Sequence, residues 1–90
     1  MKPLRFAGAF RKDLKRITRR GYRLDDLDTI VTAIRRGERL APSVRSHPLK
    51  GEWGGYWECH VAPDWLLIYK VTAEEVLLAR TGTHADLFNL

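Results

Sequence analysis

Apolar residues recur along this chain at two different periods, and the first is helical. Two series in the first half have apolar positions three or four residues apart: Phe6, Phe10, Leu14 and Ile17, and then Leu27, Ile30, Val31 and Ile34. This spacing places apolar side chains on one face of a helix. Gly21 and Gly37 follow the two series, each directly after a pair of arginines, as is typical of helix C-termini. The pattern predicts two amphipathic helices joined as a hairpin.

From residue 56 onward the pattern is that of β-strands. Residues 56–61 are aromatic and alternating, residues 65–71 (WLLIYKV) are almost continuously apolar, and residues 75–81 (EVLLART) form a third run. The short connections between them favour an antiparallel meander. One more short strand is expected at residues 2–6. The order β-α-α-β-β-β predicts a single α+β domain over residues 1–90, with two helices packed on a small, mostly antiparallel sheet.

Residues 37–55 (GERLAPSVRSHPLKGEWGG) separate these two halves. Four Gly and two Pro interrupt any period there. A connection of about 19 residues is long for a compact domain, where roughly 4–6 residues are typical. Connections of this length are usually functional, and the Leu, Val and Trp in this one argue against disorder.

Charge is divided unequally along the chain. Residues 1–50 contain 14 Lys and Arg against 5 Asp and Glu, whereas residues 51–90 contain 2 against 6, for a net charge of +5. A basic half favours a polyanionic or acidic partner, with a solvated helix face as the alternative. No apolar run approaches the ~18 residues of a membrane helix. The N-terminus lacks a signal-type apolar segment, and a single cysteine excludes an internal disulfide framework. We expect a cytoplasmic protein with no membrane partner.

Candidate chemistry gathers in residues 46–65 (SHPLKGEWGGYWECHVAPDW) and at the end of the last strand. Strand alternation places Glu58 and His60 on one face. Asp64 follows in the next turn, His84 leaves the last strand, and His47 lies on the long connection, from which it can fold over the others. Histidine, with an ordinary pKa of about 6.5, suits proton transfer at neutral pH. The pattern predicts an acid–base site, against the alternative that each histidine is a hydrogen-bonded scaffold residue.

A zinc site is a second alternative, because one cysteine and three histidines are suitable ligand types. Cys59 and His60 are neighbours on a strand, however, so their side chains diverge. The sequence contains no paired C-x-x-C or H-x-x-x-H spacing. We therefore expect no metal and no cofactor.

An acid–base site without a metal, beside a basic surface, suits RNA cleavage, because RNA supplies its own nucleophile in the 2′-hydroxyl. A base must take that proton, an acid must protonate the 5′-oxygen, and cations must stabilise the phosphorane. Three basic side chains are candidates for the last role: Lys50, Arg45 and Arg80. Trp53 is the candidate for stacking on a base. Trp65 is expected in the core, and the pattern assigns no place to Trp57.

Three motifs resemble the YafQ toxins of the RelE/ParE superfamily of toxin–antitoxin systems: HPLKG (47–51), ECHVAPDWLLIY (58–69) and RTGTHADLF (80–88). The two-helix half is also similar, so the resemblance covers nearly the whole chain. It implies a RelE-like fold and a ribosome-dependent endoribonuclease that cleaves mRNA and inhibits translation. It also implies neutralisation by a small ribbon-helix-helix antitoxin, with operator DNA bound only through the toxin–antitoxin complex.

The resemblance further implies roles for individual residues. Its catalytic positions are His47, His60, Asp64 and His84, with His84 as the general acid and His60 or Asp64 as the base. Phe88 matches an aromatic residue that positions the substrate, and Glu58 stands where some relatives have Asp. Such toxins often have Arg where this chain has Trp57, which removes one phosphate contact that Lys50 or Arg80 would have to replace.

Two other functions are open to a chain of this kind. Sister toxins of the ParE type inhibit DNA gyrase by binding it and cleave no RNA, but they lack this set of histidines. An inactive co-repressor, acting only within an antitoxin complex, is the other. The sequence has no basic recognition helix with base-reading Asn or Gln, which argues against independent DNA recognition.

Overall fold

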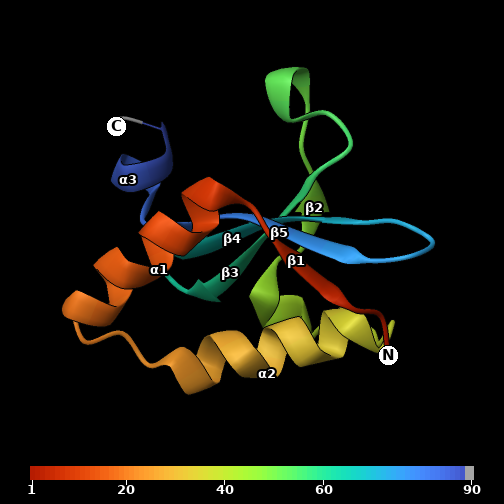
Figure 1. Ribbon diagram of the computed structural model, residues 1–90, viewed down its shortest axis with the longest axis horizontal. Helices are drawn as coiled ribbons and strands as arrows, with labels where there is room; N and C mark the ends of the chain where they lie inside the picture. Colours follow the sequence, from red (N-terminus) through yellow and green to blue (C-terminus); the bar gives the residue numbers. More distant parts are fainter. Residues whose placement is uncertain (89–90) are drawn as a thin grey trace.

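The computed structural model describes residues 1–88 and contains one five-stranded sheet with helices on both sides (Figure 1). The elements follow in the order β1 (Leu4–Phe6), α1 (Gly8–Arg19), α2 (Leu24–Arg35), the 3₁₀ turn η1 (Pro42–Val44), β2 (His47–Pro48), the 3₁₀ turn η2 (Gly51–Trp53), β3 (Trp57–Ala62), β4 (Trp65–Val71), β5 (Val76–Gly82) and α3 (His84–Phe88).

The sheet has the strand order β1-β5-β4-β3-β2. Strands β2 to β5 are antiparallel to their neighbours, and β1 pairs parallel with β5, with Leu4 opposite Val76. The predicted α+β fold and the meander of the last three strands are therefore confirmed. Strand β2 and helix α3 were not predicted, because elements of two and five residues are too short to establish a period.

Helices α1 and α2 pack on one face of the sheet and form the main core with it. Their buried residues meet the side chains of Cys59, Leu67, Tyr69, Val76 and Leu78 from the strands. Both helices end as predicted, with Gly21 and Gly37 in the left-handed region (φ 78° and 70°). Their amide groups bond back into the last helical turn, which caps its carbonyls. No helix within residues 1–88 is long and apolar enough to span a membrane.

Phe6 belongs to the short strand that was predicted at residues 2–6 and not to the first helix, in which its spacing had also placed it. Phe6 ends β1, and the amide of Ala7 donates to the carbonyl of Leu78 at 3.0 Å, so pairing with β5 keeps the chain extended until α1 begins at Gly8. The ring of Phe6 instead stacks on that of Phe10, with centroids 5.6 Å apart. A long-range backbone contact here overrides a local period.

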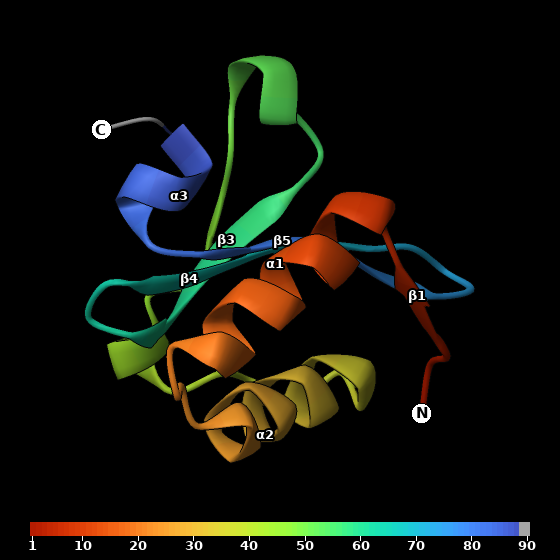
Figure 2. The same ribbon diagram turned by 60° about the vertical axis from the view of Figure 1, so that its left-hand side comes forward.

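The second face of the sheet carries the other half of each strand's side chains. Leu66 and Ile68 alternate with the core residues of β4 and are also fully buried, which confirms residues 65–71 as a central strand. Figure 2 shows α3 and the segment around η2 rising on this side, opposite α2. In the sheet register His60 lies opposite Leu66 and Glu58 opposite Ile68. The candidate acid–base residues of β3 therefore belong to this second face.

Candidate functional site

His84 and Asp64 form a tight pair at one corner of the second face. Asp64 lies in the turn between β3 and β4, and His84 is the first residue of α3. One oxygen of Asp64, Oδ1, lies 2.7 Å from Nδ1 of His84 and accepts a hydrogen bond from the His84 amide at 3.1 Å. These contacts hold the pKa of the Asp64 carboxyl below its ordinary value. The carboxylate thus fixes the imidazole and leaves its Nε2 for another partner.

His60 completes this corner. Its ring centroid lies 6.0 Å from that of His84, with the two planes inclined by 60°. The β3–β4 register shifts between His60 and Ala62, which marks an irregularity next to the site, as is common beside active sites. The structure therefore brings together three of the predicted residues, from a strand, a turn and a helix.

His47 reaches the same face from β2. It lies opposite Glu58 in the sheet register, and its Nε2 is 3.3 Å from Oε1 of Glu58. Glu58 is buried, whereas the His47 side chain is 49% exposed. Glu58 and His60 are two residues apart on one strand face, a spacing of about 7 Å. The predicted residues thus form two neighbouring groups on this face, His47 with Glu58 and His60 with the His84–Asp64 pair. Glu58 links His47 to the sheet.

The predicted cations are distributed differently. The guanidinium of Arg80 donates to both carboxylate oxygens of Asp13 in α1, at 2.6 and 3.1 Å, and this partner raises the pKa of Arg80. Asp13 itself is buried and also accepts the amide of Thr81 at 3.1 Å. Arg80 is therefore committed to joining β5 to α1. Lys50 is exposed, directly before η2.

Arg45 lies closer to the histidines than the sequence suggested. It lines a cleft of about 490 Å³ together with His60. It is the only non-glycine residue within residues 1–88 with a positive φ (53°), a conformation that costs free energy and that proteins often use at functional sites. Among the described residues, no carboxylate lies within ion-pair distance of its guanidinium.

The three aromatic residues whose places the sequence predicted lie in different parts of the structure. Trp53 is half-buried, and its ring meets that of Tyr56 edge-on at 5.1 Å. Phe88 is the half-buried last residue of α3. Trp65 is in the core as predicted, where its indole donates to the hydroxyl of Thr81 at 2.8 Å.

Trp57 points away from the histidines. Strand alternation places it with Cys59 on the helix side of the sheet, where it lines a separate pocket and is 41% exposed. A cation at this position would not have shared the face of Glu58 and His60. The departure from the usual Arg therefore does not alter the face that carries Glu58 and His60.

Sequence reasoning missed the residues that hold α3 in place. Oδ2 of Asp86 accepts the amide of Thr83 at 3.0 Å, and the hydroxyl of Thr83 accepts the amide of Asp86 at 3.1 Å. The guanidinium of Arg20, at the end of α1, donates to both oxygens of Asp86 at 2.7 and 3.0 Å. The spacing T-x-x-D is a capping-box signal that was available in the sequence. The partner from α1 was not, because it lies 66 residues away.

The chain matches the profile of the family described as bacterial toxin of type II toxin-antitoxin system, YafQ, over residues 2–89. It belongs to the YafQ toxin family. It is 40% identical over 86 residues to the mRNA interferase toxin YafQ of Escherichia coli (strain K12), covering 94% of each chain. Among solved structures, it resembles the E. coli DinJ-YafQ toxin-antitoxin complex (TM-score 0.89, 38% identity, 97% of both chains) and a metal-bound toxin from Helicobacter pylori (TM-score 0.91, 37% identity, 98% of this chain and 100% of that one).

Membership of the YafQ family confirms the resemblance carried by the three motifs, and it does not favour the ParE-like alternative. Although the H. pylori relative is metal-bound, residues 1–88 of this chain contain no group of three or more His, Cys, Asp or Glu side chains that can hold a metal ion. Burial raises the pKa of the Cys59 thiol to about 12, so this side chain is a protonated core residue.

Proposed function

We propose that this YafQ-family toxin is a ribosome-dependent endoribonuclease that cleaves mRNA by metal-independent general acid–base catalysis and thereby inhibits translation. The observation that carries the proposal is the His84–Asp64 pair at 2.7 Å with the His60 ring 6.0 Å away. Two imidazoles at this separation can both reach the oxygens of one phosphate bound beside them. The E. coli relative is named an mRNA interferase, in agreement with this chemistry.

His60 is the base in this mechanism and His84 is the acid. His60 takes the proton of the 2′-hydroxyl, whose oxygen attacks the phosphorus to form a 2′,3′-cyclic phosphate. The bond to the 5′-oxygen breaks, and His84 protonates that oxygen through Nε2. Asp64 already accepts two hydrogen bonds from His84, so we assign it to holding the tautomer and stabilising the imidazolium rather than to the base role.

Arg45 supplies the positive charge that the phosphorane requires. Its support comes from the cleft it shares with His60, its strained backbone and the absence of a carboxylate partner within residues 1–88. Glu58 orients His47, which binds the scissile phosphate. Lys50, Trp53 and Phe88 contact the flanking nucleotides, while Arg80 acts indirectly by joining β5 to α1.

The basic face of α1 contacts the ribosome. We define this face by its exposed side chains that have no carboxylate partner among the described residues: Lys12, Lys15 and Arg19. Charges of this kind contribute a sequence-independent attraction to the phosphates of RNA, which salt weakens. A ribbon-helix-helix antitoxin neutralises the toxin in the cytoplasm, and operator DNA is bound only through that complex. The solved DinJ-YafQ complex of E. coli supports an antitoxin partner.

The test is induction of the toxin in growing cells, with mRNA cleavage mapped by primer extension. Wild-type toxin should arrest growth and cut mRNA, and His84→Ala should lower the cleavage rate by about 10²–10⁴-fold. Purified toxin that has been treated with EDTA should still cleave mRNA when it is added to ribosomes in their required magnesium buffer. Full toxicity of His84→Ala would overturn the acid role. Inhibition of gyrase supercoiling without mRNA cleavage would instead support the ParE-like function.

A further inference from the structure

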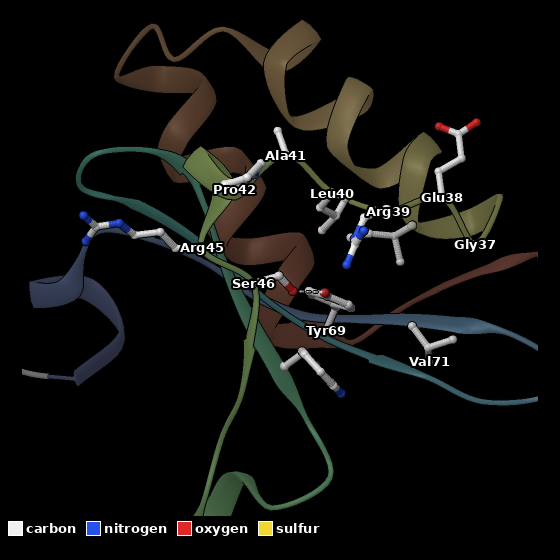
Figure 3. Close-up of a pocket in the computed structure, with 12 residues that line it drawn as sticks. Gly37, Glu38, Arg39, Leu40, Ala41, Pro42, Arg45, Ser46, Tyr69 and Val71 are labelled. Carbon is white, nitrogen blue, oxygen red and sulfur yellow. Dashed lines mark hydrogen bonds between the residues drawn. The ribbon is translucent and has the colours of Figure 1, made fainter.

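Strand β4 has different surroundings at its two ends. Near its C-terminal end, Tyr69 and Val71 line an open pocket of about 740 Å³ on the helix side of the sheet (Figure 3). At its start, Trp65 is only 4% exposed and packs edge-on against the ring of Tyr22, with centroids 5.0 Å apart. Asp64 comes directly before this buried residue, so the contacts that fix Trp65 also limit where Asp64 can lie.

Thr81 in β5 holds Trp65 through its hydroxyl. The indole Nε1 donates to Oγ1 of Thr81 at 2.8 Å, and the same hydroxyl donates to the carbonyl of Leu66 at 2.7 Å. Thr81 is fully buried, so no water competes for these bonds. A hydroxyl has one proton to donate, and the Leu66 carbonyl accepts it, so the indole N–H must meet a lone pair. The orientation of the hydroxyl, and with it that of the indole, is therefore determined.

Asp13 in α1 fixes the backbone of the same threonine. Its Oδ2 accepts a hydrogen bond from the amide of Thr81 at 3.1 Å and another from Nε of Arg80 at 2.6 Å. Asp13 is 1% exposed, and a buried carboxylate is costly unless donors such as these surround it. Because Asp13 must keep both donors, it holds the end of β5 against α1.

The place of Thr81 in the chain connects these contacts to the proposed reaction. His84 follows Thr81 by three residues, and Asp64 directly precedes Trp65. Both members of the His84–Asp64 pair therefore leave the sheet beside a group that Thr81 holds. A rotation of the indole, or a shift of the end of β5, would change the 2.7 Å distance between Oδ1 of Asp64 and Nδ1 of His84.

We infer that Thr81 is a positioning residue for the proposed cleavage reaction and that it keeps Asp64 and His84 at hydrogen-bond distance. It acts on Asp64 through the Trp65 indole. It acts on His84 through the end of β5, which Asp13 holds against α1. This role rests on the proposed function, because it requires His84 to be the acid. Thr81 lies inside the core and cannot touch RNA, so its loss should lower kcat and leave KM nearly unchanged.

The experiment compares Thr81→Val with Thr81→Ser in mRNA cleavage on ribosomes by the purified full-length toxin. Valine keeps the shape of threonine but leaves the Trp65 indole and the Leu66 carbonyl without their partner, so kcat should fall roughly tenfold with KM within about twofold of wild type. Serine keeps the hydroxyl and should keep kcat near that of wild type. Trp65→Phe, which removes the indole N–H and leaves Thr81 intact, should lower kcat similarly, and the two losses should not add in the double variant.

A control of matched stability separates positioning from a general weakening of the fold. Thr81→Val leaves two buried groups unpaired and should lower the melting temperature. Val31→Ala removes buried side-chain atoms from α2, on the opposite side of the sheet from the histidines, and should lower it comparably. At a temperature at which circular dichroism shows both variants folded, Val31→Ala should cleave as wild type does.

A spectroscopic readout tests the same contact without RNA. In nitrogen NMR spectra at about pH 9, where ordinary imidazoles are neutral, the His84 ring of wild type should show one tautomer, protonated at Nδ1 toward Asp64. Thr81→Val should show a mixture of tautomers, and Val31→Ala should not. If wild-type toxin cleaves no mRNA, the proposed function fails, while this spectrum still decides whether Thr81 positions the pair.

Three results would overturn the positioning role: wild-type kcat in folded Thr81→Val, a loss confined to KM, or an equal loss of kcat in Val31→Ala. A single, wild-type tautomer of His84 in Thr81→Val would do the same where cleavage cannot be measured. If Thr81→Val does not fold, Trp65→Phe takes its place in each of these tests, because it breaks the same hydrogen bond from the other side.

Discussion

The two histidines at the ends of the candidate site are held in opposite ways. His84 is fixed by two hydrogen bonds to Asp64, and its helix is tied to α1 by the two hydrogen bonds between Arg20 and Asp86. His47 lies on a two-residue strand, half exposed, with Nε2 3.3 Å from Glu58 and Nδ1 3.3 Å from the carbonyl of the adjacent Pro48. We therefore propose that the acid is positioned before RNA binds and that the His47 side adjusts to the substrate.

The rigid corner depends on a long-range contact because α3 has only five residues. A helix of this length is not stable alone, since nucleation is unfavourable and few hydrogen bonds follow it. Asp86 compensates by capping α3 and pairing with Arg20. Gly82 permits this approach: it has φ 152°, and a Cβ there would lie 2.8 Å from Oδ2 of Asp86. The position of His84 next to Asp64 therefore depends on contacts among α1, β5 and α3.

The largest loss of cleavage is expected from Asp64→Asn, on the side of the site where His84 is held rigidly. The amide can present its N–H toward Nδ1 of His84 and so favour the wrong tautomer, and it cannot stabilise the imidazolium. We expect the rate of mRNA cleavage on ribosomes to fall by about 10²–10⁴-fold with little change in fold. Asp28→Asn, an exposed aspartate on α2, is the matched control and should cleave as wild type does. Near-normal cleavage by Asp64→Asn would show that the pair does not act in catalysis.

A smaller effect is expected from Arg20→Ala, which releases α3 from α1 without touching the histidines. Cleavage should slow by roughly tenfold, because His84 then samples more positions, and small misplacements are costly in rate. Arg23→Ala removes the same charge from an exposed position at the start of α2, outside the α1 face assigned to the ribosome, and is the control. In a double-mutant cycle, Arg20→Ala and Asp86→Ala should be strongly non-additive. Additive effects would mean that the pair does not hold α3.

The His47 side of the site should be less sensitive to substitution. Glu58→Gln keeps the shape of the side chain and removes the charge that faces His47, so we expect a loss of cleavage of only about threefold, appearing in KM rather than kcat. Glu52→Gln, in the exposed turn η2, serves as its control. A loss as large as that of Asp64→Asn would erase the distinction between the two sides.

The smallest expected effect is on stability in acid. Arg20 and Thr83 hold the pKa of the Asp86 carboxyl well below its ordinary value. A depressed carboxyl stabilises the fold fully above its ordinary pKa of about 3.9, and this contribution is lost as pH falls below that value toward the lowered one. Between about pH 4 and pH 2, the melting temperature of wild type should therefore fall more steeply than that of Asp86→Asn. Parallel melting curves over this range would contradict the role of Asp86 as an ionised anchor.

Local patterns determined much of this protein. The period of apolar residues was sufficient for α1, α2 and β4, because amphipathic helices and buried strands leave clear signatures over seven or more residues. Strand alternation was sufficient to separate Cys59 from Glu58 and His60. Residue chemistry and the three motifs identified the set of histidines and the family.

Only the tertiary structure decided how these parts meet. The pairing of β2 with β3, the parallel pairing of β1 with β5, and the Asp13–Arg80 and Arg20–Asp86 pairs join residues that are far apart in sequence or lie in elements too short to have a period. These contacts removed Arg80 from the set of free cations and brought Arg45 into the cleft of His60. They also left Trp57 exposed on the opposite face. Local propensity cannot specify such partners, because each depends on which distant groups the folded sheet brings within a few ångströms.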